Sequence, residues 1–214
     1  TGTFSWTLAL ALTALVASAL RRAVLPFGQQ APVWRMALWI IAISGLGVCL
    51  PEAIRTLREA LAQLRHKVGE RHPLAIDMLR SLCSLERNND DLVAAERDCR
   101  DSLQLALELH GRHHRATADA RRQLAALYVD LGRFGEAETE FLDAYAWMRP
   151  RLDRNHPDLA RTYNSLGVVA WERGDIDRAI HFQTLAVEAW RAGSNRSLTA
   201  AGAYNLAMIL HGVG

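Results

Sequence analysis

Apolar residues after Pro51 recur at three- and four-residue steps, in stretches long enough to form amphipathic helices. In the clearest stretch, residues 116–131, the apolar stripe is formed by Ala118, Leu124, Leu127, Tyr128 and Leu131. Gly132 follows this stripe and supplies the left-handed conformation that helix ends often need. A second stripe runs from Phe134 to Met148, just before Pro150. The pattern predicts two helices joined by a tight turn.

This two-helix unit recurs every 42 residues, the spacing that separates His72, His114 and His156. Columns of leucine, alanine, small residues and turn residues keep the same register: Leu82, Leu124 and Leu166; Ala95, Ala137 and Ala179; Cys83, Ala125 and Gly167; Asp90, Gly132 and Gly174. A fixed period of this length indicates a stacked repeat array. One hairpin is too small to bury its own apolar face, so its stability depends on stacking against its neighbours.

The period also sets the predicted boundaries of the units. We expect a half repeat at residues 52–68, followed by repeat 1 at 69–110, repeat 2 at 111–152 and repeat 3 at 153–194. A fourth repeat, residues 195–214, stops where its turn glycine would fall. Because the chain also begins with Thr1 instead of methionine, we expect it to be a fragment of a longer protein.

The first fifty residues have a different composition. Residues 1–20 and 36–51 carry no charged side chain and are rich in leucine, alanine, isoleucine and valine. A membrane-spanning helix needs about 20 mainly apolar residues. We therefore expect two spanning helices, approximately 3–20 and 33–50, joined by a short connection that contains Arg21 and Arg22. The predicted fold class is all-α: a transmembrane helical hairpin followed by an α-solenoid.

Two alternatives to the membrane hairpin remain open. Ala17-Ser18-Ala19 fits the cleavage pattern of a signal peptide, which would leave a single anchor. The two apolar segments could also form a buried hairpin in a soluble protein. We favour the membrane hairpin over both alternatives, with residues 3–50 in contact with the lipid bilayer.

Basic residues give the predicted orientation, because positive charge favours the cytoplasmic side of a membrane. Both flanks carry such residues, but the flank after the second segment carries more of them: Arg55, Arg58, Arg65, Lys67 and Arg71. We expect a bacterial inner-membrane protein with cytoplasmic repeats.

The middle unit carries the residues that identify the repeat. A large and a small apolar residue are adjacent in its first helix, followed by an aromatic residue, a turn glycine and an Ala–Phe–Ala series in its second helix: Leu124, Ala125, Tyr128, Gly132, Ala137, Phe141 and Ala144. This series resembles the tetratricopeptide repeat in the longer form found in kinesin light chains and many bacterial proteins. Repeat 3 departs from it at Gln183, and repeat 1 departs at Glu86, Asp90 and Cys99.

The resemblance implies that the first helices line a concave face that holds extended peptides or partner helices. The family's geometry would direct these residues into the groove: Arg80, Ser84, Arg87, Arg122, Asn164, Trp171, Tyr204 and Asn205. Arginine pairs with carboxylates through a planar fork, and aromatic residues are enriched at interfaces. This set favours a protein or peptide partner with acidic character. The alternative is that Trp171 packs between units and that the arginines are only solvated.

The sequence lacks three common catalytic and ligand-binding motifs: no phosphate-binding glycine loop, serine nucleophile elbow or metal-binding His-Glu-x-x-His helix occurs. The repeat region is nearly neutral, whereas nucleic-acid binding needs clustered positive charge. We therefore expect no enzyme activity, cofactor, metal or nucleic-acid partner. We assign structural roles to the local cluster of His110, His113 and His114. His72 and His156 precede prolines and should hydrogen-bond the start of the next helix.

Cys83 and Cys99 occupy columns that could face each other across a helix hairpin. A pair of buried free thiols is favoured over a disulfide, which becomes plausible on the oxidising side of a membrane.

Two rival functions accompany the interaction scaffold. Membrane segments followed by such repeats resemble the back half of some bacterial receptor-type serine/threonine kinases. The chain would then be the sensory or regulatory tail of a signalling enzyme or transcription regulator, with its catalytic or DNA-binding domain before Thr1. An envelope-assembly factor with extracytoplasmic repeats is the third possibility, and an oxidised Cys83–Cys99 pair would favour it.

Overall fold

The computed structural model describes residues 50–213, which belong to one compact unit. This part of the chain consists of eight α-helices and no strands, which confirms the predicted helical repeat array. The helices are α3 (Leu50–Val68), α4 (Pro73–Asn88), α5 (Leu92–His110), α6 (Arg115–Asp130), α7 (Phe134–Met148), α8 (Pro157–Glu172), α9 (Ile176–Ala192) and α10 (Arg196–Val213).

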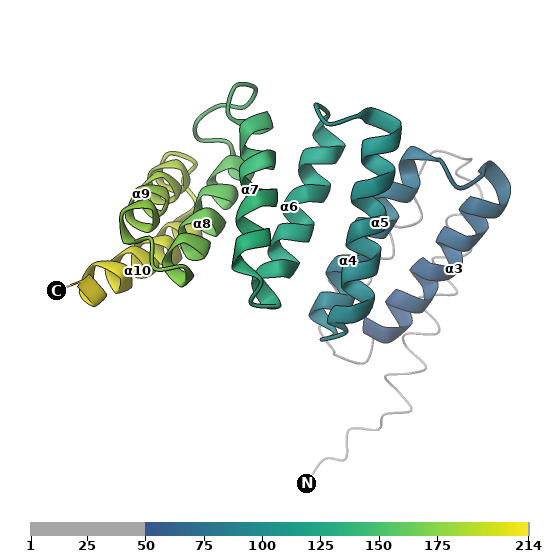
Figure 1. Cartoon of the computed structure of the whole chain (residues 1–214), viewed down its shortest axis with the longest axis horizontal. Coiled ribbons are helices and arrows are strands. Elements are labelled where there is room, and N and C mark those ends of the chain that lie inside the picture. Colours follow the sequence, from purple (N-terminus) through teal and green to yellow (C-terminus); the bar gives the residue numbers. More distant parts are fainter. Residues whose placement is uncertain (1–49, 214) are drawn as a thin grey trace, which may run out of the picture. The chain divides into compact units, whose positions relative to one another are not determined.

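Each helix packs against the next one along the chain, so that hairpins α4–α5, α6–α7 and α8–α9 follow one another in a row (Figure 1). No helix of the described part combines the length and the apolar character needed to cross a bilayer. The predicted membrane hairpin, residues 3–50, lies outside the described residues except for its last position.

The recurring histidines begin the first helix of each hairpin. The Nδ1 atoms of His72, His114 and His156 accept hydrogen bonds from the backbone N–H two residues later, at 3.1–3.2 Å. Each histidine therefore satisfies one of the backbone donors that a helix start leaves open. This confirms the predicted role of His72 and His156, and it extends that role to His114.

The turn column reverses the chain between the two helices of each hairpin. Asp90, Gly132 and Gly174 have φ angles of +62°, +69° and +76°. These left-handed angles confirm the prediction for Gly132. Glycine has no Cβ to clash there, and aspartate tolerates the conformation better than most residues.

The repeating leucines and alanines form the core. Leu82, Leu124 and Leu166 are at most 3% exposed, and the alanine column is fully buried. The small-residue column lies against the second helix. In repeat 3, a Cβ added to Gly167 would lie 2.8 Å from Cγ of Gln183, so the glycine makes room for a buried glutamine side chain.

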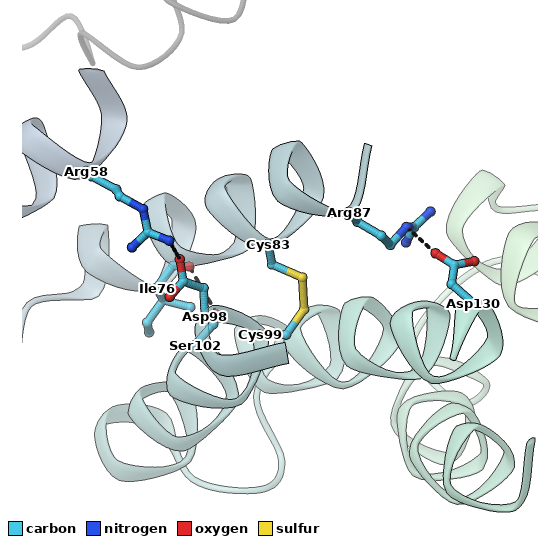
Figure 2. Close-up of a disulfide and its surroundings, with 8 residues drawn as sticks. All are labelled: Arg58, Ile76, Cys83, Arg87, Asp98, Cys99, Ser102 and Asp130. Carbon is cyan, nitrogen blue, oxygen red and sulfur yellow. Dashed lines mark hydrogen bonds and ion pairs between the residues drawn. A yellow bond between two sulfur atoms is a disulfide. The ribbon is translucent and has the colours of Figure 1, made fainter. Parts of the chain in front are cut away.

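In repeat 1 the equivalent contact is covalent: Cys83 and Cys99 form a buried disulfide between α4 and α5 (Figure 2). The predicted facing of the two columns is confirmed, but the preference for free thiols is wrong. The packing of the hairpin brings the two Cα atoms to 5.3 Å, within the range that a disulfide can bridge.

Candidate interaction face

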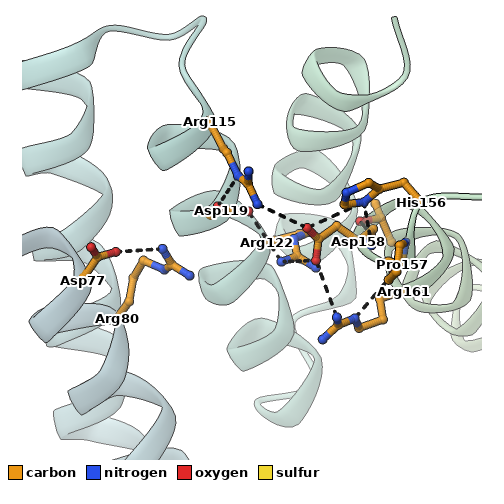
Figure 3. Close-up of polar contacts among 10 residues, drawn as sticks. Asp77, Arg80, Arg115, Asp119, Arg122, His156, Pro157, Asp158 and Arg161 are labelled. Atoms are coloured by element: carbon orange, nitrogen blue, oxygen red, sulfur yellow. Dashed lines mark hydrogen bonds and ion pairs between the residues drawn. The ribbon is translucent and has the colours of Figure 1, made fainter. Parts of the chain in front are cut away.

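The first helices of successive hairpins are neighbours, because α6 contacts both α4 and α8. Side chains that are one period apart in the sequence can therefore meet on a common face. We call the surface formed by the predicted groove residues on α4, α6, α8 and α10 the first-helix face. Figure 3 shows part of it, from Asp77 on α4 to Arg161 on α8.

Two arginines of this face are each held by an aspartate one turn earlier in the same helix. Arg80 Nη1 lies 3.1 Å from Asp77 Oδ1. Arg122 Nη2 lies 3.6 Å from Asp119 Oδ1, too far for a hydrogen bond but close enough for an ion pair. The pairs are separated by one period, so the same local geometry occurs on neighbouring helices.

Arg122 is largely shielded from solvent, since its side chain is only 19% exposed. Burial lowers the pKa of its guanidinium; Asp158 and Asp119 counteract this effect, while Arg161 and Arg80 reinforce it. The Nε atoms of Arg80 and Arg122 are both buried, and neither has a hydrogen-bond partner among the described residues. Each guanidinium thus keeps a polar donor unused.

Asp158, in the first turn of α8, is the centre of the ion pairs in Figure 3. Its carboxylate lies 3.6 Å from Arg122 and from Arg161, and 3.8 Å from Arg115. Its backbone N–H donates to His156. The carboxylate therefore links α6 to α8 and limits the excess of positive charge on this face.

The remaining predicted groove residues fall into different settings. Arg87 forms a 2.8 Å ion pair with Asp130 at the end of α6, and Figure 2 shows this bridge. Asn205 Nδ2 donates to Asn164 Oδ1 at 3.3 Å, which joins α10 to α8. Ser84 is half-buried on α4.

The two aromatic residues of the set differ from each other. The ring of Trp171 packs against α10, where a Cβ added to Gly212 would lie 2.9 Å from it. This is the packing role that the sequence left open as the alternative for Trp171. Tyr204 is 66% exposed and is available on the surface. The structure thus brings together Arg80 with Arg122, and Asn164 with Asn205.

Sequence reasoning missed the aspartates that hold these arginines. Asp77 and Asp119 occur three residues before Arg80 and Arg122, a spacing at which opposite charges pair on a helix. That repeated spacing was the available signal. The same spacing pairs Asp158 with Arg161, but the contacts of Asp158 with Arg115 and Arg122 could not be found in this way, because those two arginines belong to the neighbouring hairpin.

The histidine cluster has a structural arrangement. The rings of His110 and His114 stack with their centroids 4.1 Å apart, and His114 caps α6. Between residues 50 and 213, no group of three or more histidine, cysteine or acidic side chains is placed to hold a metal ion.

Comparison with known proteins agrees with the fold. A Podosopora anserina protein described as a kinesin light chain with nearly identical TPR-like repeats superposes with a TM-score of 0.65 at 18% identity, over 76% of this chain and 77% of that one. BtubC (BKLC) from P. vanneervenii superposes with a TM-score of 0.65 at 19% identity, over 95% of this chain and 92% of that one. No curated protein matched the sequence.

The family assignment follows from the sequence itself. The sequence model of the tetratricopeptide repeat matches residues 75–149 and 120–192, which together are more than half of the chain. Repeats of this kind generally act as non-catalytic scaffolds that bind proteins or peptides on extended surfaces. The chain belongs to the tetratricopeptide repeat family.

Proposed function

We propose that this protein is an interaction scaffold whose first-helix face binds an extended, acidic segment of a partner protein. The observation that carries the proposal is the pair of arginines, Arg80 and Arg122, which occupy equivalent positions on neighbouring first helices and keep part of their side chains exposed. Asp77 and Asp119 hold the two side chains in place before any partner arrives. Preorganisation of this kind reduces the entropy lost on binding.

The rest of the face supplies complementary contacts. The amides of Asn164 and Asn205 can bond a peptide backbone, and the exposed ring of Tyr204 can cover an apolar side chain. Ser84, Arg87 and Trp171 belong to the same predicted groove, although Arg87 and Trp171 already have partners within the protein.

A matched pair of double variants tests this function. We would measure fluorescence anisotropy of an acidic peptide library with the parent chain, with Arg80→Ala/Arg122→Ala, and with Arg149→Ala/Arg191→Ala. The control pair removes the same charge from exposed positions on or beside the second helices. A hydrogen bond to a charged group contributes about 1.5–3 kcal/mol, so we expect the first variant to bind at least ten-fold more weakly. Equal binding by the two variants would reject the groove.

We also propose that residues 3–50 anchor the repeats to a bacterial inner membrane. The support is the length and apolar character of the two segments. The test is alkaline extraction of membranes from cells that produce the full chain. The anchored protein should stay in the membrane pellet, and release into the supernatant would reject anchoring.

The disulfide in repeat 1 supports an extracytoplasmic position of the repeats, in place of the cytoplasmic position expected from the basic residues. Disulfides persist in oxidising compartments and are rare in the reducing cytoplasm. Maleimide labelling of acid-quenched cells distinguishes the two sides of the membrane. A Cys49→Ala background leaves Cys83 and Cys99 as the only cysteines of this sequence. Extracytoplasmic repeats should be labelled only after reduction, whereas labelling of Cys83 and Cys99 without reductant would place them in the cytoplasm.

A further inference from the structure

A cavity of about 460 Å³ lies in the middle of the array, away from the residues of the first-helix face. Its walls come from the α5–α6 loop, α6, α7 and the loop after α7. The lining residues used below are Arg112, Arg121, Asp143, Trp147 and Arg151. Cavities of this size are typical of sites for small molecules.

Two of the three lining arginines have no hydrogen-bonded carboxylate among the described residues. Nη1 of Arg121 lies 2.5 Å from Glu140 and 2.9 Å from Asp143. Arg112 lies 3.9 Å from Asp143, beyond hydrogen-bond distance. Arg151 donates from Nη1 to the carbonyl oxygen of Trp147 at 2.9 Å. Three arginines therefore share two carboxylates, Glu140 and Asp143, which leaves the cavity with one net positive charge.

The aromatic wall adds a second feature. The guanidinium carbon of Arg151 lies 5.2 Å from the centre of the Trp147 ring, within the range of a cation–π contact. The indole Nε1 of Trp147 is buried, and no residue of the described part accepts its hydrogen. Buried indole N–H groups usually have a partner.

Neighbouring repeats show that the fold does not require this polar lining. One period before and after Arg121 stand Leu79 and Tyr163, and both are buried. Trp147 corresponds to Leu105 and Ala189 in the same two repeats. Since a buried ion pair is often no more stabilising than well-packed apolar residues, the fold alone does not account for an arginine at position 121.

We infer that this cavity binds the phosphate group of a small soluble molecule. A phosphate monoester carries nearly two negative charges at neutral pH, which suits Arg151, whose guanidinium has a carbonyl oxygen as its only polar contact within the described part of the chain, and Arg112, whose one carboxylate contact is long and shared with Arg121. Arginine forks bind phosphate oxygens in a bidentate manner. The cavity is larger than a phosphate ion, so the organic part of the ligand fits beside Trp147.

The test is isothermal titration calorimetry of the full chain with phenyl phosphate, inorganic phosphate and benzoate, each at the same ionic strength. We expect saturable binding of phenyl phosphate, weaker binding of inorganic phosphate, and little or no heat with benzoate. Arg112→Ala and Arg151→Ala should each weaken binding of phenyl phosphate at least five-fold. Absence of saturable binding, or benzoate binding as tightly as phenyl phosphate, would overturn the inference.

A matched control comes from the repeat itself. Arg154 stands one period after Arg112 and is similarly exposed, but it forms an ion pair with Glu188 and does not line the cavity. Arg154→Ala should leave phosphate binding unchanged, and a loss equal to that of Arg112→Ala would indicate general surface charge instead of a site. Arg80→Ala/Arg122→Ala should also leave it unchanged, so this site and the peptide face can fail independently.

Discussion

Repeat 1 and repeat 2 fill the same structural position with different chemistry. In repeat 1 the small-residue column of the first helix is bonded to the second helix through Cys83–Cys99. In repeat 2 the same columns hold Ala125 and Phe141, and both are buried in the apolar core. The difference shows that the period determines where two helices meet, whereas the side chains there can be covalent or apolar.

The next turn of the first helix shows a second difference. Repeat 2 places Tyr128 there, with Arg133 over its ring at 4.4 Å and Arg100 donating to its hydroxyl group. Repeat 1 places Glu86, which is 1% exposed and contacts Arg58 of α3. Arg58 also lies 3.3 Å from the buried Asp98, as Figure 2 shows. At this position repeat 1 thus contacts its neighbour by charge, whereas repeat 2 contacts its neighbours by a cation–π contact and a hydrogen bond.

The largest expected effect is in repeat 2. Phe141→Ala removes a large ring that is only 2% exposed, and such core truncations cost about 3–5 kcal/mol. Chemical unfolding followed by circular dichroism should show this loss. Truncation of the exposed Val93 to alanine is the control, because it is 84% exposed and should change stability by no more than about 0.5 kcal/mol. A small loss for Phe141→Ala would mean that the apolar contact in repeat 2 is not its main support.

The covalent contact of repeat 1 should come next in size. The two cysteines are 16 residues apart, and closing a loop of this length stabilises a protein by about 3 kcal/mol. Cys83→Ala/Cys99→Ala should lose that amount under oxidising conditions. In reductant the parent chain should fall to a similar stability, whereas the Phe141→Ala penalty should not depend on redox conditions. If reductant left the parent chain unchanged, the disulfide would not support repeat 1.

The sequence determined the repeated part of this fold well, because helix periodicity, the turn column and the histidine caps are local signals. The prediction for Cys83 and Cys99 found their proximity but not their bond, since sequence spacing does not report redox state. The arginines Arg80 and Arg122 were selected as groove residues, and the structure adds the aspartates that hold them. The cavity beside Trp147 could not be predicted, because its walls come from two loops and both helices of repeat 2, and sequence spacing does not show which of their side chains meet.

The buried acid of repeat 1 predicts that stability depends on pH in a direction opposite to that of an ordinary paired carboxylate. Burial and the nearby Asp98 raise the pKa of Glu86 from 4.5 to about 7, although Arg58 acts in the opposite direction. Between pH 4.5 and 7 the unfolded chain loses this proton before the folded chain does, so stability falls as pH rises through this window. One pKa unit corresponds to about 1.4 kcal/mol, so this rise sets an upper limit of about 3.5 kcal/mol for the effect.

Glu86→Gln tests this effect because glutamine stays neutral at every pH. The variant should match the parent chain near pH 4.5 and become relatively more stable toward pH 7, in unfolding experiments at constant ionic strength. Glu172→Gln, at an exposed position of α8, is the control. A stability difference that stays constant across this range would mean that Glu86 does not titrate within it.

The smallest expected effect is in the turn column, where the two repeats differ by a single side chain. Asp90 and Gly132 both have left-handed φ angles, and a Cβ added to Gly132 would meet no atom within 4 Å. The two turns therefore share one backbone conformation and differ only in the side chain that has to adopt it. Gly132→Ala should cost about 1 kcal/mol, since a side chain disfavours this conformation, and Asp90→Gly should gain a few tenths of a kcal/mol. Urea unfolding gives the free energy of unfolding of both variants. A loss of stability in Asp90→Gly would show that the aspartate side chain stabilises its turn by more than the backbone strain it introduces.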